Sequence, residues 1–154
     1  MAELKSLLRE YVAGCFTGIW IQTQEPHEAV SDIQSLCSDE SWQCAKWDID
    51  RGLTLGGQAV DDGQDPLSAV KSAAAMGSET SIIILENFHR FLSSAEIVQA
   101  LVSQLQAGKQ TRSIIVVLAP VVELPPELEK LFICLLYTSP SPRDATLSRM
   151  PSSA

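Results

Sequence analysis

Polar and charged side chains stand at the points where buried, strand-like runs of this sequence end. They are Thr23, Asp48, Glu86 and Asn87, with His89 two residues further on. Ligands of open α/β sheets bind at the carboxyl ends of the strands, so these five are the candidate site residues. Glu86 follows four apolar residues, as does the acid that positions magnesium in nucleotide hydrolases. These residues are therefore candidates for binding a metal ion or a phosphate group.

A metal site at Glu86 needs partner ligands that the sequence does not show. The magnesium motif usually ends in two acids, and Asn87 takes the second place here. His89 has the chemistry of a general base, but it stands between Phe88 and Phe91, where packing or capping is the expected role. We therefore predict no catalytic residue and no resident metal, and any buried strand that ends at this edge can carry an acid.

The first predicted strand is not followed by a phosphate-binding loop. Such a loop reads Gly-x-x-x-x-Gly-Lys-Ser/Thr, and its N–H groups and lysine surround the phosphates. Residues 22–26 contain no glycine, and the carboxylates of Glu25 and Glu28 would repel phosphate. Gly-Lys-Gln-Thr at 108–111 precedes a strand instead of following one, and Ser103 replaces the first glycine. The chain is predicted to bind no nucleotide and to need no cofactor.

Four apolar runs predict the strands that would carry these residues, at 18–23, 44–49, 81–86 and 112–118. The last two are apolar at successive positions, which is typical of strands buried on both faces of a parallel sheet. The segment 52–63 is rich in Gly and Asp and is predicted to be a loop.

Apolar residues at helical spacing predict the helices between these strands. They are expected at 3–12, from Pro26 to Leu36, from Pro66 to Ala74, from Ser94 to a stop at Gly108, and from Pro125 to Glu127. Strands alternating with helices indicate an α/β fold in three layers. We expect a mainly parallel sheet of four to five strands with helices on both faces.

The overall composition excludes some partners. The 154 residues carry a net charge of −8, whereas a nucleic-acid binder needs a basic face. The longest apolar stretch, 114–122, is too short to span a bilayer and contains a proline. Residues 1–10 follow an amphipathic helix pattern and not that of a signal peptide. A cytoplasmic protein without nucleic-acid or membrane partners is expected.

The cysteines of the first 133 residues form neither a CxxC pair nor a metal-binding spacing with a histidine. They are Cys15, Cys37 and Cys44. Reduced, partly buried thiols are the expectation. Cys37 and Cys44 are close enough in sequence for a disulfide in principle, but the missing signal peptide argues against one.

The last 21 residues, Cys134 to Ala154, resemble a translated sequencing adapter. Back-translation of 134–139 gives a transposase end, that of 140–144 the adapter following it, and that of 148–154 a flow-cell end. Residues 145–147 then cover a sample index. We predict a native part of 1–133, a truncated N-terminal α/β domain, and a non-native, disordered 134–154. The alternative is a native Pro/Ser-rich phosphorylated tail.

Several segments together resemble the N-terminal domain of AAA+ ATPases encoded in bacterial and some plastid genomes. The specific ones are Leu-Glu-Asn-Phe-His-Arg-Phe-Leu at 85–92 and Leu-Ala-Pro at 118–120 followed by Leu-Pro-Pro-Glu-Leu-Glu-Lys at 124–130; looser ones are 18–25, 47–52 and 65–67. The resemblance covers nearly all of residues 1–133.

The resemblance implies a degenerate, non-catalytic copy of the P-loop, RecA-like fold. It implies a following domain that holds the phosphate loop, ATP and magnesium. Asn87 in place of an acid, Ala119-Pro120 in place of a polar sensor, and Glu129-Lys130 in place of an arginine finger all fit such a copy. The full-length parent would be a homo-oligomeric ATPase that remodels a protein client.

The expected role is packing against the parent's own ATPase domain, ordering a ring, or docking a partner. With its final strand lost after Ile133, the sheet would expose an edge and the fragment would be marginal. Two alternatives remain: a stand-alone receiver-like regulatory module, and part of a small α/β enzyme whose active site lies in the missing region.

Overall fold

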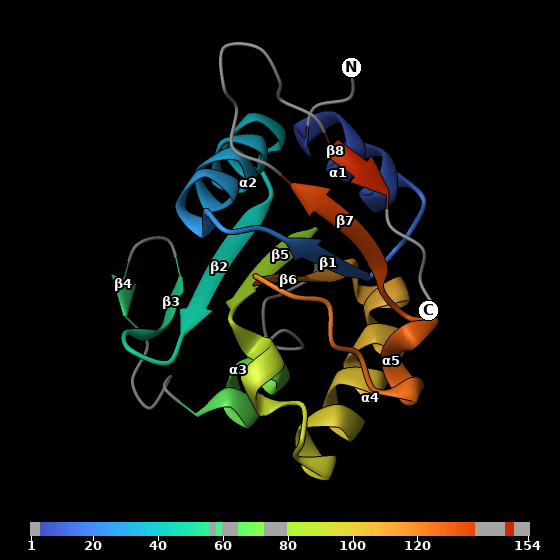
Figure 1. Ribbon diagram of the computed structural model, residues 1–154. Coiled ribbons are helices and arrows are strands. Elements are labelled where there is room, and N and C mark those ends of the chain that lie inside the picture. The colour runs from blue at the N-terminus through green and yellow to red at the C-terminus, as the bar shows by residue number, and fades with distance from the viewer. Residues whose placement is uncertain (1–3, 56–57, 60–64, 73–79, 138–146, 150–154) are drawn as a thin grey trace.

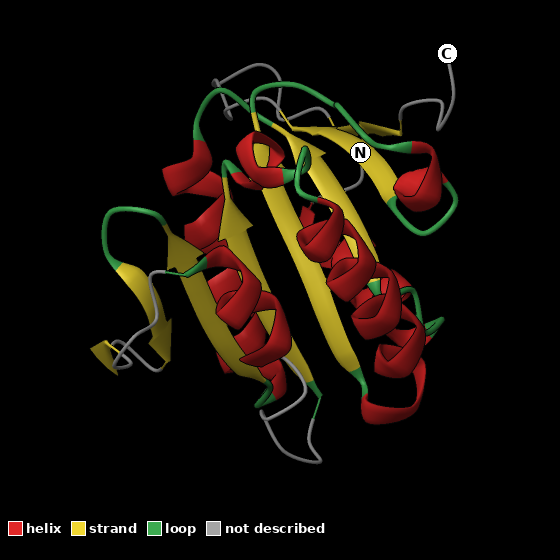
Figure 2. Ribbon diagram, turned by 90° about the horizontal axis from the view of Figure 1, so that it is seen from below, coloured by secondary structure: helices red, strands yellow, loops and turns green. Residues whose placement is uncertain are grey.

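The computed structural model describes residues 4–55, 58–59, 65–72, 80–137 and 147–149. A mixed sheet lies between two layers of helices (Figures 1 and 2). The described strands stand in the order β4-β3-β2-β5-β6-β1-β7-β8. Their bounds are β1 Gly18–Gln22, β2 Gln43–Asp48, β3 Gly52–Leu55, β4 Gln58–Ala59, β5 Ser81–Glu86, β6 Ser113–Ala119, β7 Ile133–Tyr137 and β8 Leu147–Arg149. The predicted three-layer α/β fold is confirmed.

The helices divide between the two faces of the sheet. Their bounds are α1 Leu4–Ala13, α2 Pro26–Glu40, α3 Pro66–Ser72, the 3₁₀ helix η2 Phe88–Phe91, α4 Ala95–Thr111 and α5 Pro126–Glu129. One core cluster joins α1 and α2 to one face, and the other joins α3, η2, α4 and α5 to the opposite face. The alternate residues of β5 show why: Ile82 and Ile84 belong to the first cluster, Ile83 and Leu85 to the second.

Five neighbouring strands of the described sheet run parallel: β2, β5, β6, β1 and β7. In the order of the chain they are the second, third, fourth, first and fifth. The first strand is therefore enclosed between the fourth and the fifth, with Trp20 opposite Val117 on one side and Cys134 on the other. β3, β4 and β8 extend the two edges in antiparallel pairing.

The predicted loop at 52–63 is wrong where the structure describes it. Residues 52–55 form β3 and pair with β2, and β4 pairs with β3 in turn. Leu53 of β3 is buried against the core, so the edge hairpin follows from an apolar residue within the Gly- and Asp-rich segment. Residues 56–57 and 60–64 lie outside the described part, as do Ala73 and Ala74 of the predicted third helix.

Helix α4 continues past Gly108, where the sequence predicted a stop. A Cβ atom at Gly108 would lie 2.5 Å from the Ser113 carbonyl oxygen and 3.1 Å from the Thr17 side chain. The glycine therefore permits close packing of the helix on the sheet. The helix ends at Arg112, a left-handed residue with φ 57°.

The strand expected to be missing after Ile133 is present. Residues 133–137 form β7 beside β1, with Cys134 and Leu135 buried. The Tyr137 hydroxyl donates a 3.0 Å hydrogen bond to Asp32 of α2. The expected open edge and the expected disorder of these residues are therefore wrong, because Ile-Cys-Leu-Leu-Tyr has the apolar, β-prone character that this position requires. Residues 138–146 and 150–154 of the predicted adapter lie outside the described part.

Candidate functional site

The winding of the sheet reverses between β1 and β6. The chain leaves β1 for α2 on one face, and it leaves β6 for α5 on the opposite face. Such a topological switch point opens a crevice at the carboxyl ends of the strands, where α/β proteins bind ligands. A cavity of about 240 Å³ lies here, lined by Thr23, Gln24, Pro26, Asn87, Leu118, Ala119 and Pro120.

The structure separates the five predicted site residues into three places. Thr23 and Asn87 line the switch-point cavity. Asp48 and Glu86 stand together at the ends of the adjacent strands β2 and β5, because the parallel register pairs the preceding residues Trp47 and Leu85. His89 lies in η2 and is not a lining residue of this cavity.

The loop after β1 directs its polar groups to the protein itself. The Thr23 N–H donates to the Ala119 carbonyl oxygen at 2.9 Å, and the Thr23 hydroxyl accepts the Glu25 N–H at 3.0 Å. Pro26 starts α2 and has no N–H to offer. The Gln22 side-chain amide donates to the Pro120 carbonyl oxygen at 3.1 Å. A phosphate site uses free N–H groups at a helix start, and Thr23, Glu25 and Pro26 offer none.

Lys46 bridges the two carboxylates at the strand ends. Its Nζ lies 3.0 Å from Glu86 Oε2 and 3.3 Å from Asp48 Oδ2. Glu86 is only 9% exposed, so the ion pair holds a charge that burial alone would penalise. Lys46 was not among the predicted site residues. The signal was its position two residues before Asp48, which puts both side chains on one face of a strand.

The pKa values of Lys46 and Asp48 favour the charged forms of these two side chains. Burial alone lowers the pKa of Lys46, but the hydrogen bonds and charges of Glu86 and Asp48 outweigh it, and the pKa is raised. Burial alone raises the pKa of Asp48, yet the Arg51 N–H, 2.7 Å from Oδ1, and Lys46 bring it below its usual range. Lys46 and Asp48 are therefore suited to a lasting ion pair.

This donor set does not fit a resident magnesium ion. An ammonium group takes the position between the two carboxylates that a cation would need. Within the described residues, no group of three His, Cys, Asp or Glu side chains is arranged to hold a metal ion. In this structure Asp48 and Glu86 are therefore ion-pair partners of Lys46.

His89 sits beside an aromatic cluster. Trp47 makes edge-to-face contacts with Phe88 and Phe91, each at a centroid distance of 5.5 Å. Burial, helped by the charge of Arg90, lowers the pKa of His89, and Glu123 opposes this effect. Its Nδ1 is buried and makes no hydrogen bond to any described residue. The imidazole is therefore mainly neutral near pH 7.

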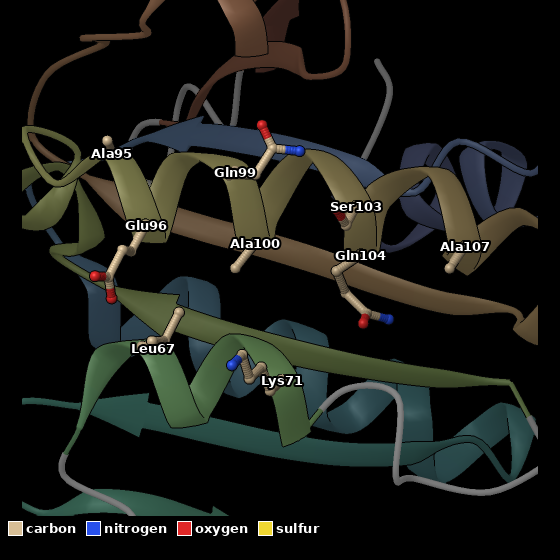
Figure 3. A pocket seen from close by; sticks show the side chains of 9 residues that line it. All are labelled: Leu67, Lys71, Ala95, Glu96, Gln99, Ala100, Ser103, Gln104 and Ala107. Carbon is tan, nitrogen blue, oxygen red and sulfur yellow. The ribbon is translucent and has the colours of Figure 1, made fainter.

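A second hollow, an apolar groove, lies between α3 and α4 (Figure 3). Its volume is about 680 Å³, and it is lined by Leu67, Lys71, Ala95, Glu96, Gln99, Ala100, Ser103, Gln104 and Ala107. Leu67 and Lys71 of α3 face Ala100 and its neighbours on α4 across the groove. No sequence pattern pointed to it, because the pairing of these helices depends on the sheet order.

No described helix is long and apolar enough to cross a membrane. Comparison with curated proteins finds no match. Comparison with solved structures finds none either. The sequence model of the SpoVK-like AAA ATPase N-terminal domain, in contrast, matches residues 4–137. That range starts at the first residue of α1 and ends at the last residue of β7. The chain therefore belongs to the SpoVK-like AAA ATPase N-terminal domain family.

Proposed function

We propose that this domain is the non-catalytic N-terminal domain of a cytoplasmic AAA ATPase and serves to pack against the ATPase domain or dock a partner. The observation that carries the proposal is that polar groups at the strand ends are already engaged within the protein. The Thr23 hydroxyl accepts the backbone N–H of Glu25, and Lys46 is bound to Glu86 and Asp48. In a nucleotide hydrolase these positions would hold phosphate and magnesium.

Calorimetric titration of the chain with ATP and magnesium tests this proposal. We expect no saturable binding at millimolar nucleotide, because the N–H groups of Thr23 and Glu25 are engaged within the protein and Pro26 has none. The Lys46→Met variant is titrated in parallel with the unaltered chain, because it removes the ammonium group that pairs with Glu86 and Asp48. If it also fails to bind magnesium-ATP, the loop and not the lysine is decisive. Saturable binding by the unaltered chain would contradict the proposal.

The strand order argues against the receiver-like alternative. Receiver modules share the flavodoxin-like order, in which the first strand lies between the second and the third. Here β1 lies between β6 and β7, the fourth and fifth parallel strands of the described sheet. A receiver module also needs an aspartate after its third strand. Here β5 ends at Glu86, which pairs with Lys46, and Asn87 follows it.

The α3–α4 groove is the surface that supports docking. Small side chains at intervals of about one helical turn, such as Ala100 and Ala107 with Ser103 between them, let another backbone approach closely. An apolar helix face is the partner that such a groove accommodates. Lys71 and Glu96 at its walls offer opposite charges to polar residues of that helix.

We propose a helix of the parent's own ATPase domain as the occupant. In the proposed parent, that domain hydrolyses ATP with magnesium, forms a homo-oligomer and acts on a protein client. Adding the ATPase domain in trans to the chain should give measurable binding that Ala100→Phe abolishes, because the larger side chain fills the groove. Glu10→Gln on α1, at the opposite face, is the control. Equal binding by all three proteins would contradict the groove as the docking surface.

A further inference from the structure

Two cysteines meet where α2 turns into β2. Cys37 lies in the last turn of α2, and Cys44 is the second residue of β2. Ser41 between them adopts a left-handed conformation with φ 60°, which reverses the chain. The Trp42 N–H donates to the Cys37 carbonyl oxygen at 2.8 Å and fixes this turn. The backbone therefore brings the start of β2 back against the end of the helix.

The two thiols lie within hydrogen-bonding reach of each other. Both belong to the core region between the sheet and helices α1 and α2. Cys37 is 2% exposed, whereas Cys44 is half-buried. The other two cysteines are elsewhere: Cys15 is exposed after α1, and Cys134 is buried on the opposite face of the sheet.

We propose that Cys37 and Cys44 form a redox-active dithiol, which a low-molecular-weight disulfide such as oxidised glutathione converts into an intramolecular disulfide. Cys44, the more exposed of the two residues, attacks as the thiolate. It bonds to one sulfur of oxidised glutathione and releases one glutathione thiolate. Cys37 then gives up its proton and attacks the Cys44 sulfur, which releases the second glutathione. Two electrons pass to the oxidant, and two glutathione thiols result.

The electrostatics of the pair support this order of events. A hydrogen bond from Cys37 lowers the pKa of Cys44 against the opposing effect of burial. The same bond, with burial, raises the pKa of Cys37. A stabilised, partly accessible thiolate beside a resolving cysteine is the arrangement found in redox-sensing proteins. Disulfides in reducing compartments are usually transient ones of this kind.

The disulfide would fasten the end of α2 to the start of β2. At present that junction is held by the turn at Ser41 and by packing of the two thiols in the core. Closing a covalent loop there restricts the unfolded chain and raises the thermal midpoint.

The test treats the whole chain with oxidised glutathione and maps its cysteines by mass spectrometry of intact protein and peptides. We expect loss of two hydrogen atoms, a Cys37–Cys44 linked peptide, and reversal by dithiothreitol. Cys37→Ser should instead accumulate glutathione on Cys44, and Cys44→Ser should leave Cys37 unmodified. Cys15→Ser is the matched control and should still form the link.

Two outcomes would overturn the proposal. The first is glutathione on Cys44 of the unaltered chain without an internal link. The second is equal modification of Cys37 and Cys44 in the two single variants. Circular dichroism of each reduced variant separates a loss of fold from a loss of reactivity, and the result on the unaltered chain does not depend on any variant.

Discussion

Lys46 is the residue whose removal should reveal most about the strand-end cluster. In Lys46→Met, the carboxylate of Glu86 keeps its buried position and loses the ammonium 3.0 Å away. Breaking a buried pair from one side leaves an uncompensated charge, so we expect a loss of about 3 kcal/mol in unfolding free energy. Urea denaturation at pH 7 measures it.

The double variant Lys46→Met, Glu86→Leu is the control for that change. Replacing both charges of a buried pair by apolar groups is often neutral or stabilising, so most of the lost stability should return. A single Lys46→Met variant as stable as the original chain would show that water, and not the protein, already solvates Glu86.

Asp48 should make the stability of the protein depend on acid pH. Its folded-state pKa is lowered, chiefly by the Arg51 N–H and Lys46 acting against burial. Its contribution is therefore complete above the unfolded-state pKa of about 3.9 and is lost as pH falls through the lower folded-state value. The difference in unfolding free energy between the original chain and Asp48→Asn should be constant from pH 5 to 7 and shrink below about pH 4.

A difference between the two proteins that stays constant down to pH 2 would contradict this account of Asp48. Denaturant titrations at each pH, followed by tryptophan fluorescence, suit the experiment because Trp20 and Trp47 are fully buried.

Residue types at strand ends were predictable, and their grouping was not. Thr23, Asp48, Glu86 and Asn87 all follow predicted strands and reach the expected edge of the sheet. The strand order decides that Asn87 joins Thr23 at one cavity while Asp48 joins Glu86 at another place. Since strand order depends on contacts between distant segments, a local pattern cannot supply it.

At the scale of elements, β7 is the strand on which the enclosure of β1 depends. Leu135 is fully buried, and Tyr137 is tied to Asp32 of α2. A chain ending at Tyr137 should melt cooperatively and remain monodisperse, whereas a chain ending at Ile133 should aggregate because one side of β1 is uncovered. Thermal denaturation with light scattering distinguishes the two.

Equal behaviour of the two shortened chains would mean that β7 adds nothing to the sheet beside β1. A Leu136→Ser variant of the longer chain is the control, because that side chain is 36% exposed and its replacement should leave folding intact.

Elements with strong periodicity were predicted well, and those decided by tertiary contacts were not. The run 81–86 is β5 to the residue, because its apolar residues fill both core clusters. The sequence predicts a helix stop at Gly108 because glycine commonly ends helices, but α4 continues to Thr111. The close approach of Gly108 to the side chain of Thr17, 91 residues earlier in the chain, is a contact that no local pattern contains.

For the whole molecule, the decisive prediction concerns the gene. Reading source DNA from upstream of Ile133 should show the sequence departing from Cys134–Ala154. We expect another apolar strand and then Gly-x-x-x-x-Gly-Lys-Ser/Thr with an acidic strand after it, as a following ATPase domain requires. The family match supports such a parent.

Genomic DNA that encodes Cys134–Ala154 and then stops would contradict the adapter interpretation. A continuing frame without a phosphate loop would favour the small α/β enzyme instead. The match of the family through Tyr137 would stand in either case, because it describes the chain as it is.

The enclosure of β1 also sets the order in which a ribosome lets this protein fold. β1 leaves the ribosome early, but its two partners, β6 and β7, are the last parallel strands to be made. The Trp20 indole bonds to Val121, 101 positions later. Until then the apolar faces of β1 and α1 have no sheet to join, and such long-range pairing is slow. Nascent chains that end before β7 should therefore engage chaperones, while those that include β7 should not.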